Sequence, residues 1–385
     1  MAVLGGVLVW KHGRQAVWQG GAKTFSLMFL CLWVPIVLSV PDSLWFKKSL
    51  STALTYPRIY LAGIYIIWML REELARQRLL KLSAWLLLFW VFDALVQAVV
   101  GYDLLGYAYP ERLNGLFGPD NWKLGLSLAM LSPVVWEYVS RQGAKWQLAL
   151  AWLTTAVVVL LASNRQSWVI FVLATALWGG RYAYSHGLRS LWMLVLALAI
   201  TALAGTAAYQ FNPKFALQID KTLLAERLTY EGLNNASSGR LRIWENATQV
   251  FLDHPVNGVG ARSYRYAYAE HAEPGDPYIS PDGTGVIYAH QLVLEVGSEA
   301  GMIGLAGLAA LLLIFARSSR KAANDPLTWS IWLGGFAWLF PLNTHTAIYS
   351  AYWSLLIGWM IAVSQATHGE ITGTMHDLAD VASRS

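Results

Sequence analysis

The feature that most constrains this chain is a series of ten apolar stretches, each about as long as a helix that crosses a lipid bilayer. A helix needs about 20 mostly apolar residues to cross the hydrocarbon core. The ten stretches run approximately over residues 24–40, 54–70, 82–101, 122–140, 146–162, 167–184, 189–209, 291–315, 328–342 and 346–364. Several are short, so an amino-terminal or loop segment would bring the total to eleven or twelve. The pattern predicts an all-α polytopic membrane protein with about 10–12 transmembrane helices.

The composition agrees with a membrane location. Apolar residues make up 56% of the chain and charged residues only 13%, and the mean hydropathy is +0.41. These values lie outside the range of soluble globular domains. The 20 Trp and 18 Tyr residues fit a chain with many membrane interfaces, because amphipathic rings settle at headgroup depth.

Lys and Arg are distributed unequally between alternate loops. One set of loops carries 14 of them, and the opposite short loops carry six. Loops rich in Lys and Arg stay in the cytoplasm, so both termini are expected there and the loop at 210–289 is expected to face outward. The chain then divides into amino-terminal transmembrane helices (1–209), one large, partly helical outer loop (210–289), and carboxy-terminal transmembrane helices with a short cytoplasmic tail (290–385).

Within the outer loop, the stretch SSGRLRIWENATQVFLDHP (237–255) predicts an amphipathic helix, with Leu241, Trp244, Ala247 and Phe251 on one face. Arg240 falls in its first turn, where free backbone N–H groups and the helix dipole favour an anion. Trp244 shares a face with Arg240 at i, i+4, whereas Arg242 points about 200° away. The plainer interpretation of Arg240 is a solvated helix face.

Two further arginines stand at outward loop ends. Arg165, next to Asn164 in SNRQSW (163–168), lies in a tight turn between two spans, where a charge is costly. Its planar fork suits phosphate oxygens, although snorkelling to the headgroups would also explain it. Arg265 and Tyr266, in ARSYRY (261–266), fit aromatic contact with a sugar, a cation–π contact or a plain surface loop.

His290 is the one histidine beside both the large loop and a span, and His345 in the last outer turn is its competitor. An unperturbed imidazole titrates near pH 6.5, so it can accept a proton; a structural role at the start of a helix is the alternative. No Asp-x-Asp, Walker, His-Glu-x-x-His or Cys-rich motif occurs. Neither a metal nor a cofactor is therefore expected, and cationic side chains would take the place of a metal.

Four motifs together resemble the O-antigen ligase family, which belongs to a superfamily with O-antigen polymerases and bacterial protein O-oligosaccharyltransferases. They are RLNGLFGPDNW (112–122), SNRQSW, SSGRLRIWENA…DHPVNGVG (237–260) and HQLVLEVGSEAGMIGL (290–305), in family order. Two departures from the family pattern are Asp120 between Pro119 and Asn121, and Gln291 where Asn is common. The resemblance implies a catalytic histidine at His290 and essential arginines at Arg165 and Arg240. Arg112 and Arg265 carry over less directly.

The resemblance also implies the reaction and its location. It implies a glycosyltransferase of the Gram-negative inner membrane, with a periplasmic site that moves O-antigen glycan from undecaprenyl diphosphate to a lipid A-core sugar. Membrane lipids are expected partners, and nucleic acid is not. The sister activities, glycan polymerisation and protein glycosylation, are alternatives. A transporter of an anionic lipid-linked solute, with Asp93 as a proton relay, is the alternative from another class.

Overall fold

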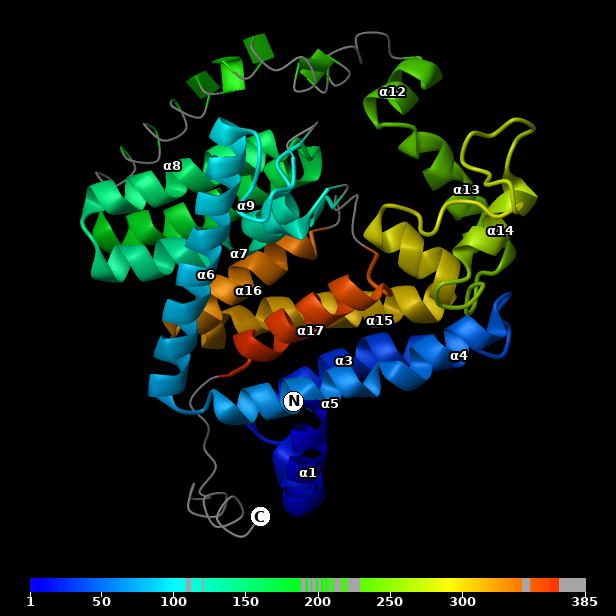
Figure 1. The fold of residues 1–385 in the computed structure, drawn as a ribbon. Coiled ribbons are helices and arrows are strands. Elements are labelled where there is room, and N and C mark those ends of the chain that lie inside the picture. The colour runs from blue at the N-terminus through cyan, green and yellow to red at the C-terminus, as the bar shows by residue number, and fades with distance from the viewer. Residues whose placement is uncertain are drawn as a thin grey trace.

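The structure is a computed structural model that describes residues 1–108, 112–119, 121–187, 229–340 and 347–366, with a few positions between 192 and 220. These residues form helices joined by loops, and among them the only β-type pairing is an isolated bridge between Tyr102 and Ala108. The all-α membrane fold predicted from the sequence is confirmed. Figure 1 shows the long helices α3, α5, α15, α16 and α17 running beside one another, with α6 crossing them at a steep angle.

The described helices follow the apolar stretches closely. The amino-terminal part contains α1 (Ala2–His12), α2 (Arg14–Val17), α3 (Gly20–Leu38), α4 (Phe46–Thr55), α5 (Pro57–Met69) and α6 (Glu73–Val100). The short helix η1 (Gly115–Phe117) then precedes α7 (Lys123–Gln142), α8 (Lys145–Leu161) and α9 (Arg165–His186). The rest comprises α12 (Tyr230–Ala236), α13 (Arg240–Asp253), α14 (Tyr264–His271), α15 (Leu292–Ala322), α16 (Pro326–Trp338) and α17 (Ala351–Ser364). The predicted span 189–209 lies mostly outside the described residues; each of the others overlaps a helix.

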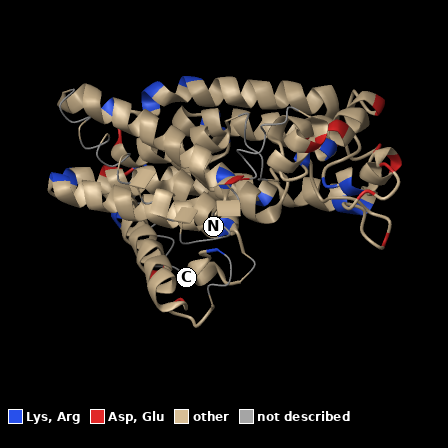
Figure 2. Ribbon diagram, turned by 90° about the horizontal axis from the view of Figure 1, so that it is seen from above, with Lys and Arg blue, Asp and Glu red and all other residues tan. Residues whose placement is uncertain are grey.

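Three of the described helices, α3, α6 and α15, are long and apolar enough to cross a membrane by themselves. The helices α1, α8 and α17 are apolar but shorter. The total of 10–12 spans and the boundary between 209 and 210 remain predictions. Figure 2 shows that Lys, Arg, Asp and Glu gather mainly toward the two ends of the molecule, with mostly uncharged helices between them.

The helix α7 forms the centre of the bundle. Every residue from Leu124 to Trp136 is buried, and α7 packs against α6, α8, α9 and α16. A helix that is apolar on all sides is stable only when neighbours surround it. The core therefore fixes where the first residues of α7 and α9 lie, and with them the loops at that end of the bundle.

The described part of the predicted outer loop, residues 229–289, is called the outer segment here. It has a small hydrophobic core of its own, separate from the core of the helix bundle. Residues of α13, α14 and the following loop form it, including Ile243, Val250, Tyr264 and Tyr268. The helix predicted at 237–255 corresponds to α13, and the predicted apolar face matches the buried face only in part. Ile243, Asn246, Ala247 and Val250 are buried, whereas Leu241, Trp244 and Phe251 are half-buried. On the buried face, Tyr264 donates a hydrogen bond from its hydroxyl to the Ile243 carbonyl, 3.0 Å away.

The outer segment is built into the membrane helix α15. At Gly301, α15 departs from helical geometry with φ 61°, ψ −157°, a conformation that glycine adopts readily. The preceding loop fills the break, because the N–H groups of Met302 and Ile303 donate to the carbonyls of Pro255 and Val256 at 2.8 and 3.2 Å. The backbone of the loop at residues 255 and 256 thus packs directly against α15 at Gly301.

Asp93 anchors the loop that follows α6. It is buried in α6, and its two carboxylate oxygens accept the N–H groups of Leu104 and Leu116, each at 2.9 Å. Gln97, one turn further, accepts the N–H groups of Asn114 and Gly115 at 3.1 and 2.9 Å. This use of both oxygens gives Asp93 a structural role in holding η1 against the bundle.

Candidate active site at the outer end of the helix bundle

Arg165 connects the bundle to the outer segment. Asn164 caps α9, since its side-chain oxygen accepts the N–H of Gln166 at 3.1 Å, and Arg165 is the first residue of the helix. The two terminal nitrogens of Arg165 donate hydrogen bonds to the Ala236 carbonyl and the Ser238 hydroxyl. A guanidinium fork suits two acceptors of this kind. The start of α9 is therefore fixed to the turn that leads into α13.

Arg240, the first residue of α13, lies close to Arg165. Burial, and next the positive charge of Arg165, lower the pKa of Arg240 below its ordinary value, while Tyr288 and Tyr278 act in the opposite direction. Arg165 and Arg240 are both half-buried. An anion bound between two such guanidinium groups is stabilised, because its negative charge offsets their mutual repulsion. Arg242 faces elsewhere, 3.8 Å from the Glu273 carboxylate, as the helical spacing predicts.

Tyr288 lies between the surroundings of His290 and Arg240, because its ring contacts His290 and its hydroxyl is affected by the charge of Arg240. The ring centroids of His290 and Tyr288 are 4.2 Å apart. Burial raises the pKa of Tyr288 to about 12, with Glu295 acting in the same direction and the charges of Arg240 and Arg262 opposing it. The Tyr288 hydroxyl therefore stays protonated near neutral pH. The charges of Arg240 and Arg262 both act on this hydroxyl.

The residue after His290 fixes the start of α15. The Gln291 side chain accepts the N–H of Leu294 at 2.7 Å, so it is the N-cap of the helix. At this position, where the resemblance leads one to expect Asn, Gln performs a helix-capping function. His290 consequently stands just ahead of a capped membrane helix.

Backbone strain is concentrated around these side chains. The non-glycine residues with positive φ in the described part of the chain are Ser163, Ser238, Arg262 and His290, with φ of 52°, 61°, 70° and 55°. Such conformations are sparsely populated, persist only where surrounding structure enforces them, and tend to cluster at functional sites. Ser163 and Ser238 each precede a candidate arginine by two residues. His290 itself adopts one of these conformations.

Arg265 and Tyr266, two predicted sugar-binding residues, have other partners, one within the outer segment and one in the turn before α4. Arg265 donates to the Thr284 hydroxyl and lies 3.6 Å from the Asp282 carboxylate. The Tyr266 ring meets the edge of Trp45, with centroids 5.0 Å apart. Neither residue has a described contact with Arg165, Arg240 or His290.

Arg112 and Trp244, also candidates for binding the substrate, lie in two different places. Arg112 stacks over the Trp122 ring at 4.4 Å, in the loop that precedes α7. Trp244 is half-buried, one turn after Arg240 on α13. His345, the competing histidine, lies outside the described residues.

The sequence indicated that Glu299 could orient the imidazole or bond to a neighbouring segment, but it did not indicate a role for Arg262. The buried Glu299 carboxylate accepts the backbone N–H groups of Arg262 and Tyr264 at 2.7 and 3.3 Å, which holds the start of α14 against α15. The charge of Arg262 reaches Tyr288. The only sequence signal was the run of small residues in GVGAR (258–262), which marks a close approach of two backbones.

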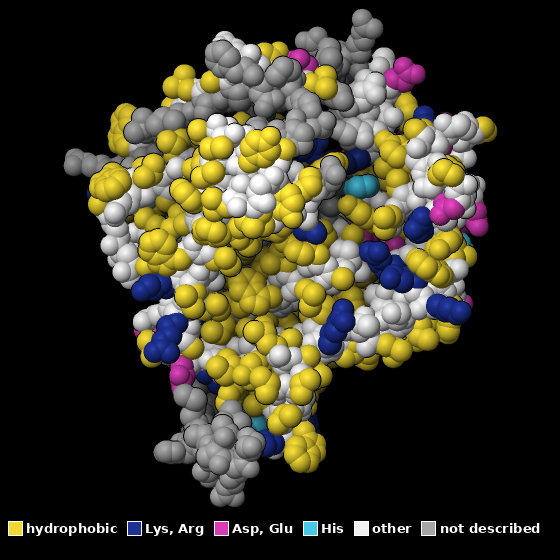
Figure 3. All heavy atoms as spheres, viewed as in Figure 1, with side chains coloured by type: hydrophobic (Ala, Val, Ile, Leu, Met, Phe, Trp, Pro, Cys, Tyr) yellow, Lys and Arg dark blue, Asp and Glu magenta, His cyan; other side chains and the backbone are white. Residues whose placement is uncertain are grey.

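Figure 3 shows the surface context. On the face drawn there, a histidine side chain and several Lys and Arg side chains border a hollow in a mostly hydrophobic surface. Within the part of the chain that the structure describes, no three His, Cys, Asp or Glu side chains gather closely enough to hold a metal ion.

The fold and this site define a helical membrane protein that presents arginines and a histidine at one end of its bundle. A family model described as O-antigen ligase matches residues 149–309. The match confirms the resemblance to the O-antigen ligase superfamily, and it supports a glycosyltransferase as the class of enzyme. Arg165, Arg240 and His290 all fall within the matched range. Comparison with curated proteins gives no match.

Proposed function

We propose that this chain is a glycosyltransferase that moves O-antigen glycan from undecaprenyl diphosphate to a sugar of lipid A-core, on the periplasmic face of a Gram-negative inner membrane. Both termini then lie in the cytoplasm. The observation that carries the proposal is a chain of neighbours: the charge of Arg165 acts on Arg240, that of Arg240 acts on Tyr288, and the Tyr288 ring lies against His290. A diphosphate needs fixed cations, and an acceptor hydroxyl needs a base.

In the proposed reaction, His290 accepts the proton of the acceptor hydroxyl. The acceptor oxygen forms a bond to the anomeric carbon on the side opposite the diphosphate, so the configuration inverts. The bond between that carbon and the diphosphate oxygen breaks, and the diphosphate leaves with the electron pair. Arg165 and Arg240 stabilise the negative charge that develops on it, without a metal or cofactor.

The expected contributions are large. A positioned general base accelerates a reaction by about 10² to 10⁴, and a fixed donor opposite developing charge contributes about 10² to 10³. Asn164, Trp244, Tyr266, Arg112 and Arg265 are proposed to contact the glycan at the rim of the site. Because Arg265 already has partners in Thr284 and Asp282, its contribution is expected to be the smallest among the arginines.

The test is glycan transfer by purified His290→Ala and Arg165→Ala variants in detergent containing a metal chelator. Transfer should fall by at least about 10² in each, while the thermal unfolding midpoint stays near that of the wild type. Full activity in either variant removes that residue from the mechanism. Loss of wild-type activity on chelation, restored by a divalent cation, contradicts the metal-independent reaction.

A second experiment decides among the sister activities. The wild-type chain is supplied with one lipid-linked donor and, separately, with lipid A-core, a second lipid-linked glycan and a pilin-like protein. Transfer to lipid A-core supports the ligase. Transfer to either of the others alone replaces it with a polymerase or a protein glycosyltransferase.

A further inference from the structure

A second polar cavity lies at the end of the bundle away from His290. It has a volume of about 1250 Å³, and the starts of α6 and α16 and the ends of α7 and α15 line it. His290 directly precedes α15, whereas Lys321 is in the last turn of the same helix. At 1.5 Å per residue, the two are separated by about 46 Å along the helix.

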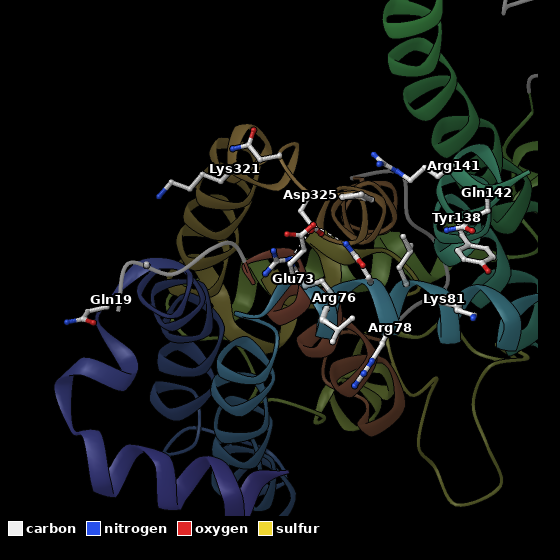
Figure 4. Close-up of a pocket in the computed structure, with 16 residues that line it drawn as sticks. Gln19, Glu73, Arg76, Arg78, Lys81, Tyr138, Arg141, Gln142, Lys321 and Asp325 are labelled. Carbon is white, nitrogen blue, oxygen red and sulfur yellow. Dashed lines mark hydrogen bonds and ion pairs between the residues drawn. The ribbon is translucent and has the colours of Figure 1, made fainter. Parts of the chain in front are cut away.

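The cavity has an excess of positive charge. Its lining includes the basic residues Arg76, Arg78, Lys81, Arg141 and Lys321, but only the acids Glu73 and Asp325. In Figure 4, Arg76 turns toward Asp325 at the centre, and Arg141 and Lys81 stand to one side, next to Tyr138 and Gln142. The lining therefore favours an anion.

Arg76 has a structural role in this cavity. Its side chain is 1% exposed, its Nε donates to Asp325 at 2.8 Å, and one terminal nitrogen donates to the Leu70 and Arg71 carbonyls. Arg141 is more accessible, at 53% exposed, and pairs with Glu137 on its own helix at 2.9 Å. Arg78, Lys81 and Lys321 are exposed as well. Among these accessible basic groups, Lys81 and Arg141 are the two on the side of Tyr138 and Gln142 (Figure 4).

An apolar groove adjoins the cavity on that side. Its volume is about 490 Å³, and it lies between α6, α7 and α8. Tyr138 and Gln142 line both spaces. The remaining lining is mostly apolar and includes Trp85, Leu88, Leu95, Trp146 and Leu150.

The side of α6 that lines both spaces changes character along its length. Gln77 and Lys81 line the cavity, and Trp85, Leu88 and Leu95 continue the same helical face into the groove. From Lys81 to Leu95 the helix rises about 21 Å, which exceeds half of the roughly 30 Å hydrocarbon core. The polar and apolar parts thus have the proportions of a headgroup and an acyl chain in one leaflet.

Two tryptophans mark the boundary between the parts. Trp85 and Trp146 are 57% and 65% exposed, and they line the groove from α6 and α8 respectively. Amphipathic indole rings are enriched at the level where headgroups meet hydrocarbon. Their position matches the polar-to-apolar change between Lys81 and Trp85.

We propose that this cavity and groove together bind an anionic phospholipid, with its phosphate against Lys81 and Arg141 and an acyl chain between α6 and α8. The charge of the cavity selects an anion, and the adjoining groove selects one that carries a hydrocarbon chain. A free phosphate has the negative charge but has no hydrocarbon chain. The proposal is independent of the glycosyltransferase reaction, because its residues lie at the other end of α15.

The first experiment measures binding of phosphatidylglycerol and phosphatidylethanolamine to the detergent-purified full-length chain by native mass spectrometry. The wild type should prefer phosphatidylglycerol. The variant Lys81→Gln/Arg141→Gln should lose about 30-fold in phosphatidylglycerol affinity, the effect of two basic side chains at a membrane surface. The matched control Arg317→Gln/Arg320→Gln removes two exposed charges near the end of α15 that do not line the cavity, and it should bind as the wild type does.

The second experiment separates a lipid from a free phosphate. Leu150 is 50% exposed in the groove, so Leu150→Trp fills the groove without changing charge, and it should weaken phosphatidylglycerol binding. Inorganic phosphate and glycerol phosphate should not displace the lipid at equal concentration. Wild-type binding by the Lys81→Gln/Arg141→Gln variant overturns the site. Unchanged binding by Leu150→Trp, together with displacement by phosphate, overturns the lipid as its ligand. Unchanged thermal unfolding midpoints show that each variant is folded.

Discussion

The two hydrogen bonds from Arg165 to the turn before α13 provide the sharpest test of the proposed site. Arg165→Lys keeps the positive charge but loses the fork that reaches both the Ala236 carbonyl and the Ser238 hydroxyl. A hydrogen bond to a charged group contributes about 1.5–3 kcal/mol. Since about 1.36 kcal/mol corresponds to a tenfold change in rate, we expect kcat/KM for glycan transfer to fall by about 10- to 150-fold.

The mechanism of that loss is tested by a double-mutant cycle with Ser238→Ala, which removes the acceptor and leaves the arginine. If both changes act through the same contact, the double variant should be little worse than Arg165→Lys alone, with a coupling of about 1 kcal/mol or more. The assay is transfer from a purified lipid-linked donor at low substrate concentration. Arg181→Lys is the control, because Arg181 lies on the same helix but donates to the Ala323 carbonyl at its other end.

Two results would refute this reasoning. Strictly additive losses from Arg165→Lys and Ser238→Ala would show that the contact between them does not position the site. A wild-type rate for Arg165→Lys would show that charge alone is sufficient, and that the connection between α9 and α13 has no part in catalysis.

Three further predictions concern charge, backbone and pH. Arg240→Gln should lower transfer by about 10²-fold, whereas Arg242→Gln, two residues away and directed toward Glu273, should change it less than about twofold; equal losses would contradict the assignment. Gly301→Ala should cost about 2 kcal/mol or more in unfolding free energy, because φ is 61° and a Cβ would lie 2.3 Å from a loop carbonyl oxygen. Gly180→Ala, which meets nothing within 4 Å, should be neutral or slightly stabilising, as thermal unfolding will show. The pKa of Tyr288 is raised to about 12 from an ordinary value near 10, so the folded state holds this proton more tightly. Its contribution to stability is complete below about pH 10 and is lost between about pH 10 and 12, up to roughly 2.7 kcal/mol. The Tyr288→Phe variant should not show this loss of unfolding free energy between about pH 10 and 12. If its pH profile of unfolding equals that of the wild type, Tyr288 is not the group responsible.

Much of the fold could be predicted because crossing a bilayer imposes a simple pattern on the sequence. Apolar runs of sufficient length gave α3, α6 and α15 directly, and the flanking polar motifs predicted α13. What could not be predicted was contact between segments far apart in the chain. Hydrophobic periodicity placed Trp244 with Ala247 on one face of α13, yet the residues that contact Tyr264 of α14 are Ile243 and Asn246.

The candidate site was predictable in its residue types and less so in its geometry. The resemblance and the cost of a charge near hydrocarbon singled out Arg165, Arg240 and His290. Their arrangement depends on the contact between Arg165 and Ser238, which are 73 positions apart, and no local pattern contains that information. Likewise, no local pattern in the sequence indicated that Asp282 pairs with Arg265.

The insertion of the loop backbone into the break of α15 has a consequence for folding. At Met302 and Ile303, the partners of two backbone N–H groups come from residues 255 and 256, and an unsatisfied group in hydrocarbon costs several kcal/mol. The break at Gly301 therefore requires residues 255 and 256 to be in place, whereas a regular helix through this position would satisfy its own N–H groups. We expect folding of the loop and formation of the break in α15 to be one coupled event.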